Sequence, residues 1–195
     1  MLRRLYDWTM TKAASPHAPM WLAFVSFLES SVFPIPPDVM LLPMGLARRE
    51  RAIAYAVLAT VASVAGALVG YAIGHFLWEA VGQPVIAFYG YEPAFARFQA
   101  EFKRYGELLV LVFGVTFFPF KVITIASGVV EMNPAAFLAS AAVARALRFL
   151  PEGWLLWRFG PPIQAFIERR LVWLASAFVV LLVLGFLLVG WGART

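Results

Sequence analysis

The chain of 195 residues has no cysteine, only two histidines and few charged side chains. Without cysteine it forms no disulfide, no thiolate metal site and no cysteine nucleophile. His17 and His75 alone do not make a histidine metal centre, so we expect no metal and no cofactor. Charged residues are 14% of the chain and apolar residues 62%, whereas soluble domains have about 25% and about 45–50%. A soluble globule cannot bury this much apolar surface, so the composition indicates an integral membrane protein.

The usual catalytic and nucleic-acid motifs are also missing. The sequence has no glycine-rich phosphate loop with a lysine, no His-Glu-x-x-His and no Gly-x-Ser-x-Gly, so we expect no enzyme activity and no catalytic residues. The net charge of +5 comes without a basic motif interleaved with aromatics, and we expect no nucleic-acid partner. Basic residues near cytoplasmic loops and anionic lipid explain this charge better.

Long uncharged stretches predict membrane spans. Residues 52–78 and 171–193 contain no Asp, Glu, Lys or Arg, and about 20 apolar residues cross a hydrocarbon core. A third span is predicted over residues 134–158. Its start is marked by Asn133 as the N-cap and Pro134 at the first helical position, a pair that is typical of helix N-termini.

Two more apolar stretches are interrupted by prolines. The stretch over residues 18–47 is interrupted at Pro34, Pro36 and Pro37 and again at Pro43, and the stretch over residues 107–130 is interrupted at Pro119. Proline removes a backbone donor and ends a helix, so each stretch is predicted as half-helix, break and half-helix. Broken backbone at membrane depth is tolerated only inside protein or beside water. We therefore expect two re-entrant hairpins.

The order of these segments predicts the architecture. We expect an all-α polytopic membrane protein with an inverted repeat of two re-entrant hairpins, each followed by a transmembrane helix, plus a final transmembrane helix. The transmembrane domain covers residues 18–160, and residues 171–193 form the last helix. Residues 1–17 are predicted as an amphipathic segment on the cytoplasmic surface. Residues 92–106 place three phenylalanines on one face and are expected on the outer surface.

The distribution of basic residues predicts the orientation. One face carries nine lysines and arginines and the opposite face carries four, and the more basic face is normally cytoplasmic. The N-terminus is then inside and the C-terminus outside. The nine are Arg3, Arg4, Lys12, Arg48, Arg49, Arg51, Arg158, Arg169 and Arg170, and the four are Arg97, Lys103, Arg104 and Arg194.

Two carboxylates flank the break of the first hairpin. Glu29 lies ten residues after Pro19, hence about 15 Å deep if the segment is helical, and Asp38 follows the prolines on the returning arm. Close carboxylates in a low dielectric favour a shared proton, and ionisable groups inside membranes are functional by default. We interpret both as transport or proton-coupling residues. The alternative is that Glu29 only caps backbone amides freed by the break.

Three basic residues are expected at similar depth. Lys121 follows Pro119 in the second hairpin, and Arg145 lies about 17 Å into its predicted span. Arg145 has no acidic neighbour three or four residues away, so Glu29 or Asp38 is its expected partner. Arg148 lies four residues before Glu152, a spacing that allows an ion pair. We interpret Lys121, Arg145 and Arg148 as contacts for a head-group phosphate; the alternative is a purely structural ion-pair network.

A stripe of small residues marks the first uninterrupted span. Gly66, Gly70 and Gly74 recur every four residues and make a smooth face for close helix contact. This face suits contact with a hairpin or with a second subunit. We expect a possible homodimer through it.

The two broken segments carry a family resemblance. The run from Phe27 to Asp38, Phe-Leu-Glu-Ser-Ser-Val-Phe-Pro-Ile-Pro-Pro-Asp, followed by the glycine-rich span, resembles the DedA family, also described by its VTT domain. The run from Phe118 to Gly128, Phe-Pro-Phe-Lys-Val-Ile-Thr-Ile-Ala-Ser-Gly, is similar to the YqaA-like branch of that family. The resemblance covers about residues 18–160.

The resemblance implies a polytopic protein of the bacterial inner (cytoplasmic) membrane that moves lipids between leaflets. It implies undecaprenyl phosphate or a phospholipid as substrate, with protons as possible coupling ions. The acidic positions of the family correspond to Glu29 and Asp38. The second hairpin of the family typically has two arginines around a proline, and here only the later position is matched, by Lys121. Because lysine does not fork onto phosphate, Arg145 or Arg148 would have to supply that contact.

The sequence therefore predicts a flippase- or scramblase-like lipid transporter. One alternative is a proton-coupled transporter of a small ion or solute, which needs the same acids. A second alternative is a structural membrane assembly protein, in which the buried charges only hold the hairpins together.

Overall fold

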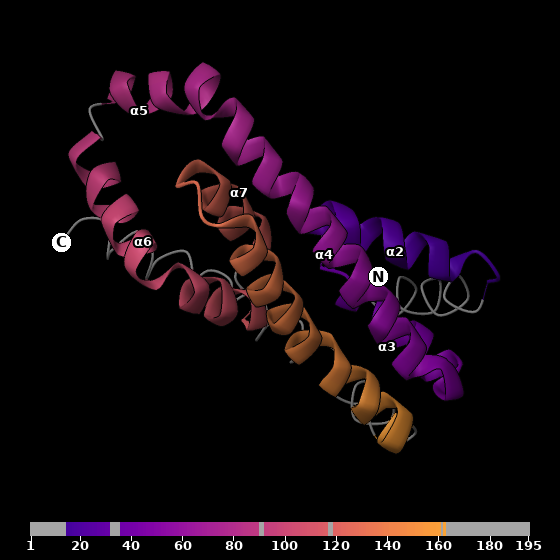
Figure 1. Cartoon of the computed structure of the whole chain (residues 1–195). Coiled ribbons are helices and arrows are strands. Elements are labelled where there is room, and N and C mark those ends of the chain that lie inside the picture. The colour runs from indigo at the N-terminus through magenta and orange to yellow at the C-terminus, as the bar shows by residue number, and fades with distance from the viewer. Residues whose placement is uncertain (1–14, 32–35, 90–91, 117–118, 161, 163–195) are drawn as a thin grey trace.

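The computed structural model describes residues 15–31, 36–89, 92–116, 119–160 and 162. All regular elements within these residues are helices (Figure 1), which confirms the all-α prediction. The predicted amphipathic segment before residue 15, the predicted helix over residues 171–193 and Pro34 lie outside the described residues.

The first broken segment forms two short helices, α2 (Ala18–Glu29) and α3 (Asp38–Ala47). Pro37 is the N-cap of α3, as expected from a proline that precedes a helix. The expected second break at Pro43 is wrong, because α3 continues through this residue. Pro43 is buried together with its neighbours Leu41 and Met44, and this burial offsets the hydrogen bond that the proline ring removes.

The long helix α4 (Ala52–Leu77) follows a single 3-10 turn over Arg49–Arg51. Among the described residues, one helix, Arg49–Ala80, is long and apolar enough to cross a membrane. One face of α4 is buried and consists almost entirely of small side chains, which lets neighbouring helices approach closely. These residues are Ala52, Ala56, Ala59, Ser63, Gly66, Ala67, Gly70 and Gly74.

The segment after α4 is more helical than the sequence suggested. A π-helical turn over Trp78–Gly82 leads into α5 (Gln83–Tyr89), and α6 follows as one helix from Glu92 to Val115. The sequence assigned residues 92–106 to a surface helix and later residues to a hairpin arm. That separation is wrong. Gly106, at the expected boundary, is a buried helix residue packed against Phe102 rather than a helix end.

The second half ends in α7 (Phe120–Val129) and a helix over residues 134–160. Between them Glu131 has a positive φ of 54°, which turns the chain sharply. The side chain of Asn133 accepts hydrogen bonds from the backbone amides of Ala135 and Ala136, both at 3.0 Å. This confirms the predicted helix start, because these two amides have no partner inside the helix.

Helix α4 lies at the centre of the arrangement (Figure 1), with α2 and α7 packed against it. The helix over residues 134–160 runs beside α4, where a Cβ on Gly153 would lie 2.5 Å from the Cβ of Ala56. One core, around Leu22, Leu41 and Phe149, joins α2, α3, α4 and this helix. A second core contains residues of α4, α6, α7 and the same helix.

The glycine stripe of α4 packs against both broken segments of the same chain. A Cβ at Gly66 would lie 2.0 Å from the carbonyl oxygen of Phe27, and one at Gly74 would lie 2.0 Å from that of Ile125. At Gly70 a Cβ would meet Thr124 Oγ1 at 2.2 Å. Of the two contacts that the sequence left open for this face, the structure shows the one with the broken segments of the same chain, and the homodimer stays a prediction.

Candidate functional site

Arg145 forms a buried ion pair with Glu29. Arg145 lies on the helix over residues 134–160, and its side chain is 4% exposed; Glu29 ends α2, and its side chain is 12% exposed. The distance from Arg145 Nη2 to Glu29 Oε2 is 2.7 Å. The sequence left Glu29 and Asp38 open as partners of Arg145, and the structure selects Glu29.

Two serines close this pair into a ring of hydrogen bonds. Arg145 Nε donates to Ser63 Oγ at 2.6 Å, and the hydroxyls of Ser63 and Ser30 are 2.6 Å apart. Ser30 Oγ donates to Glu29 Oε2 at 3.1 Å. An ionised carboxylate only accepts, so the Ser30 proton points to Glu29 and Ser63 must donate to Ser30. Every group of the ring then has a partner.

The remaining surface of Arg145 is also covered. Nη1 donates to the carbonyl oxygen of Gly114 at 3.5 Å. The rings of Phe120 and Phe149 lie 4.7 Å and 4.6 Å from the guanidinium carbon, which is cation–π distance. Arg145 thus contacts α2, α4, α6 and α7 from its own helix. A buried charge is tolerated when it is paired and hydrogen-bonded in this way.

Arg148, one turn later, binds two carboxylates. Arg148 Nη2 contacts Asp38 Oδ1, and Arg148 Nη1 lies 3.5 Å from Glu152 Oε2, which confirms the predicted Arg148–Glu152 pair. These side chains are more accessible than Arg145: Arg148 is 15% exposed and Asp38 is 21% exposed. Glu29 and Asp38 therefore face separate guanidinium groups.

Lys121 lies in the first turn of α7 and is half-buried. Thr124 Oγ1 contacts two carbonyl oxygens, that of Lys121 at 2.9 Å and that of Ser30 at 3.0 Å. This hydroxyl ties the backbone near Lys121 to the break of the first hairpin. The preceding residue, Phe120, covers Arg145. The convergence of the Lys121 ammonium with the other charges stays a prediction.

The broken ends of the two hairpins thus meet at one place. Ser30, just after α2, and Thr124, near the start of α7, both lie against the middle of α4, at Ser63 and Gly70. Sequence reasoning missed Ser30, Ser63 and Thr124. The signal was available for Ser63, which lies three residues before Gly66 on the small-residue face and is the polar member of that stripe.

The arrangement separates two chemical roles. Each of the three nitrogens of Arg145 donates one hydrogen bond, and the rings of Phe120 and Phe149 pack against its guanidinium, so it holds the helices together and orients Glu29. Arg148 is more exposed than Arg145 and contacts two carboxylates. A guanidinium binds carboxylate and phosphate in the same forked geometry. The Arg148 cluster, defined here as Asp38, Arg148 and Glu152, is therefore suited to exchange a carboxylate for a phosphate.

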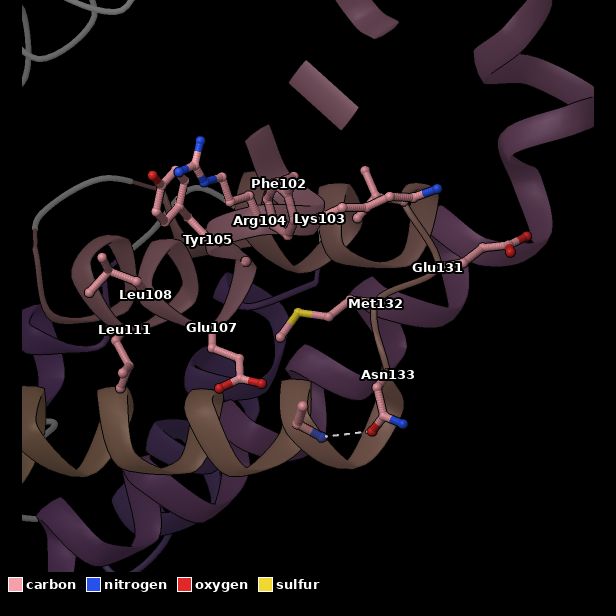
Figure 2. Close-up of a pocket in the computed structure, with 13 residues that line it drawn as sticks. Phe102, Lys103, Arg104, Tyr105, Glu107, Leu108, Leu111, Glu131, Met132 and Asn133 are labelled. Atoms are coloured by element: carbon pink, nitrogen blue, oxygen red, sulfur yellow. Dashed lines mark hydrogen bonds between the residues drawn. The ribbon is translucent and has the colours of Figure 1, made fainter. Parts of the chain in front are cut away.

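A separate pocket of about 680 Å³ lies between α6 and the turn before the helix over residues 134–160. Figure 2 shows Glu107 pointing toward the first turns of that helix and Met132 extending from the turn. Its wall does not include any of the five charged residues that the sequence predicted for the site. Nothing in the sequence pattern indicates this pocket, because it depends on how α6 crosses the later helix.

Comparisons with known proteins assign the family. The VTT domain model matches residues 35–155, a range that contains the Arg148 cluster and Arg145, whereas Glu29 precedes it. An uncharacterised protein of Haemophilus influenzae is 36% identical over 182 residues, covering 93% of this chain and 94% of that protein. An uncharacterised protein of Histophilus somni is 34% identical over 183 residues, covering 94% and 95%.

No solved structure matches the chain. Proteins with a VTT domain are membrane-associated, and the apolar helix α4 agrees with this placement. The match over residues 35–155 also agrees with the resemblance carried by the two proline-containing motifs. The chain therefore belongs to the VTT domain family, and this membership implies a membrane-associated, transporter-like role.

Proposed function

We propose that this protein moves lipids with a phosphate head group between the leaflets of the bacterial inner membrane. The substrate would be a phospholipid or a polyprenyl phosphate such as undecaprenyl phosphate. The observation that carries the proposal is the meeting of both hairpin breaks at a buried cluster of two arginines and three carboxylates. Buried charges at broken helices are typical of transport sites in membrane proteins.

The proposed mechanism is an exchange of anions on Arg148. The phosphate enters between the hairpins and displaces Asp38, while the acyl chains stay in the surrounding lipid. The displaced carboxylate is neutralised by a proton, or is bound again when the phosphate leaves toward the other leaflet. Lys121 would add a second positive charge from the second hairpin. Arg148 would then provide the forked phosphate contact that the second hairpin lacks.

Arg145 has a different part in this proposal. Its ring of hydrogen bonds joins α2 and α4 to the helix that carries Arg148. A phosphate at Arg145 would have to compete with its contacts to Glu29, Ser63 and Gly114. We therefore assign the first encounter with the head group to Arg148, and Arg145 and Glu29 would follow only if the hairpins move apart.

A liposome assay tests the proposal. The full-length protein is reconstituted, and fluorescent phospholipids and a labelled polyprenyl phosphate are followed between leaflets by quenching from one side. We expect a rate above that of protein-free vesicles for at least one phosphate-bearing lipid. No increase for any lipid tested would refute the proposal. Proton flux without lipid movement would instead favour a proton-coupled transporter of a small ion or solute.

The burial of Arg145 and its contacts to four other helices favour a second candidate, a structural membrane assembly protein. In that case Glu29→Gln should lower thermal stability and have no separate effect on activity. A Glu29→Gln variant with wild-type expression and stability but without complementation of a deletion strain would contradict this candidate.

A further inference from the structure

The two arginines of the site differ in their acidic partners. Among the described residues, Arg145 is paired with Glu29, whereas Arg148 serves both Asp38 and Glu152. If all five groups are ionised, two positive charges face three negative charges, and the net charge is −1. Separating a net charge from water is costly in a low dielectric. A single proton on one carboxylate makes the group neutral.

Glu152 is the least stabilised of the three carboxylates. Its contact with Arg148 is 3.5 Å long, at the limit of a hydrogen bond, while Glu29 Oε2 lies 2.7 Å from Arg145. Its second oxygen, Oε1, is buried and has no hydrogen-bond partner within the described part of the chain. Both oxygens of an ionised carboxylate accept hydrogen bonds and need donors, and leaving one buried without a donor is costly.

The surroundings of Glu152 also favour its neutral form. The charged groups that face it, among the residues that the structure describes, are Asp38 from α3 and Arg148 from its own helix. Asp38 repels a second negative charge, and its direct contact with Arg148 already neutralises that arginine. The side chain of Glu152 is only 14% exposed, so water does little to screen this repulsion.

We propose that Glu152 carries the exchangeable proton of the site. A Glu152 oxygen takes the proton from water on one side and returns it to water, and no other bond changes. The consequence for phosphate binding rests on the proposed function. With Glu152 protonated, binding of a phosphate monoanion changes the net charge of the site from 0 to −1. With Glu152 ionised, the change is from −1 to −2. Protonation of Glu152 therefore favours binding of the phosphate to Arg148.

Infrared spectroscopy of the full-length protein in vesicles tests the proton assignment without any lipid transport. The wild type should show a protonated-carboxyl band that disappears on titration to alkaline pH. Glu152→Gln should remove this band, and Glu152→Asp should shift it if the glutamine variant does not fold. Glu50→Gln, at an exposed acid outside the site, is the matched control and should leave it. A band that persists unshifted in the Glu152 variants, or no band in the wild type, would overturn the inference.

The pH profile of transport tests the coupling. The wild-type rate should fall as pH rises, by up to about tenfold per pH unit for one titrating group, whereas Glu152→Gln, a mimic of the neutral acid, should give a flat profile. Equal pH profiles for the two proteins would overturn the coupling to Glu152. A wild type that shows the infrared band but moves no lipid would refute the proposed function and leave the proton assignment in place.

Discussion

Arg145 shows how one side chain can define the junction of several helices. Its nitrogens donate to Glu29, Ser63 and Gly114, and two phenylalanine rings lie at cation–π distance from its guanidinium. Removing a guanidinium from water costs much free energy, which offsets most of what the ion pair contributes to stability. The main effect of this cluster is therefore to favour one arrangement of the helices. Any variant that removes one partner leaves the other charge buried.

Replacing Arg145 should therefore be strongly destabilising. Arg145→Ala is expected to lower the free energy of unfolding by about 3–5 kcal/mol, because it leaves the Glu29 carboxylate buried and unpaired. Unfolding in detergent, followed by circular dichroism, measures the effect. Arg97→Ala, at an exposed arginine of α6, is the control and should change stability by less than about 0.5 kcal/mol. Similar losses for both variants would contradict the pairing.

Removing the Ser63 hydroxyl should lower stability more than expected for so small a side chain. Ser63→Ala leaves Arg145 Nε without its acceptor and should cost about 1–3 kcal/mol. Thr60→Ala is the matched control one turn earlier. Thr60 Oγ1 donates to the carbonyl oxygen of Ala56 in its own helix, so its loss removes no described contact between helices. We expect the control to cost less than about 1 kcal/mol. Thermal unfolding measures both variants, and an equal loss of stability in the two would argue against the hydrogen-bonded ring.

At this scale, part of the site could be predicted from the sequence. Arg145 and Glu29 were candidates because helix rise places both far from the predicted membrane surface, and their opposite charges need each other there. Ser30, Ser63 and Thr124 were missed because serine and threonine are common in helices and commonly bond their own backbone. Their roles depend on which helices meet, and this is a tertiary property.

At the scale of elements, local chemistry predicted breaks better than continuity. Pro37 and Pro119 precede helices, as expected, because proline suits these positions. Pro43 does not end α3, since a buried face on either side of it holds the helix together. The continuous α6 was missed because its polar and apolar halves have different compositions and Gly106 lies between them, although this glycine is a buried helix residue and does not end the helix.

The glycine stripe of α4 gives a test of the packing between elements. Gly70→Ala would place a Cβ 2.2 Å from Thr124 Oγ1 and 2.9 Å from the Ser30 carbonyl oxygen. Overpacking of this kind costs about 1–3 kcal/mol, and Gly70→Leu should prevent folding. Ala65→Leu, on the exposed face of α4, is the control and should fold. Size-exclusion chromatography of fluorescent fusions separates the cases; a folded Gly70→Leu protein that lost only self-association would contradict the packing within one chain.

Removing the N-cap of the helix over residues 134–160 should lower stability by a smaller amount than replacing Arg145. Asn133→Ala should cost about 0.5–2 kcal/mol, because two backbone amides lose their acceptor. Asn133→Asp retains an acceptor oxygen and should stay close to the wild type. Thermal unfolding in detergent measures both variants, and an equal loss in the two would show that the cap oxygen is not the cause.

At the scale of the whole molecule, composition predicted the class and the exceptional charges predicted the site. The 62% apolar content indicates a membrane protein, and the VTT domain family agrees with it. What composition and spacing do not provide is the relative placement of segments far apart along the chain. The contact between Arg148 and Asp38 joins residues 110 positions apart, and only the packing of α3 beside the later helix brings them together.

For the whole molecule, we propose that a lipid phosphate replaces a carboxylate on Arg148 as the lipid crosses the membrane. The most direct test compares translocation of a fluorescent phospholipid or labelled polyprenyl phosphate by the wild type and by Arg148→Gln in identical vesicles, after thermal unfolding has shown that both are folded. The account predicts a rate above protein-free vesicles for the wild type and the protein-free rate for Arg148→Gln. Equal rates for the two folded proteins would contradict it.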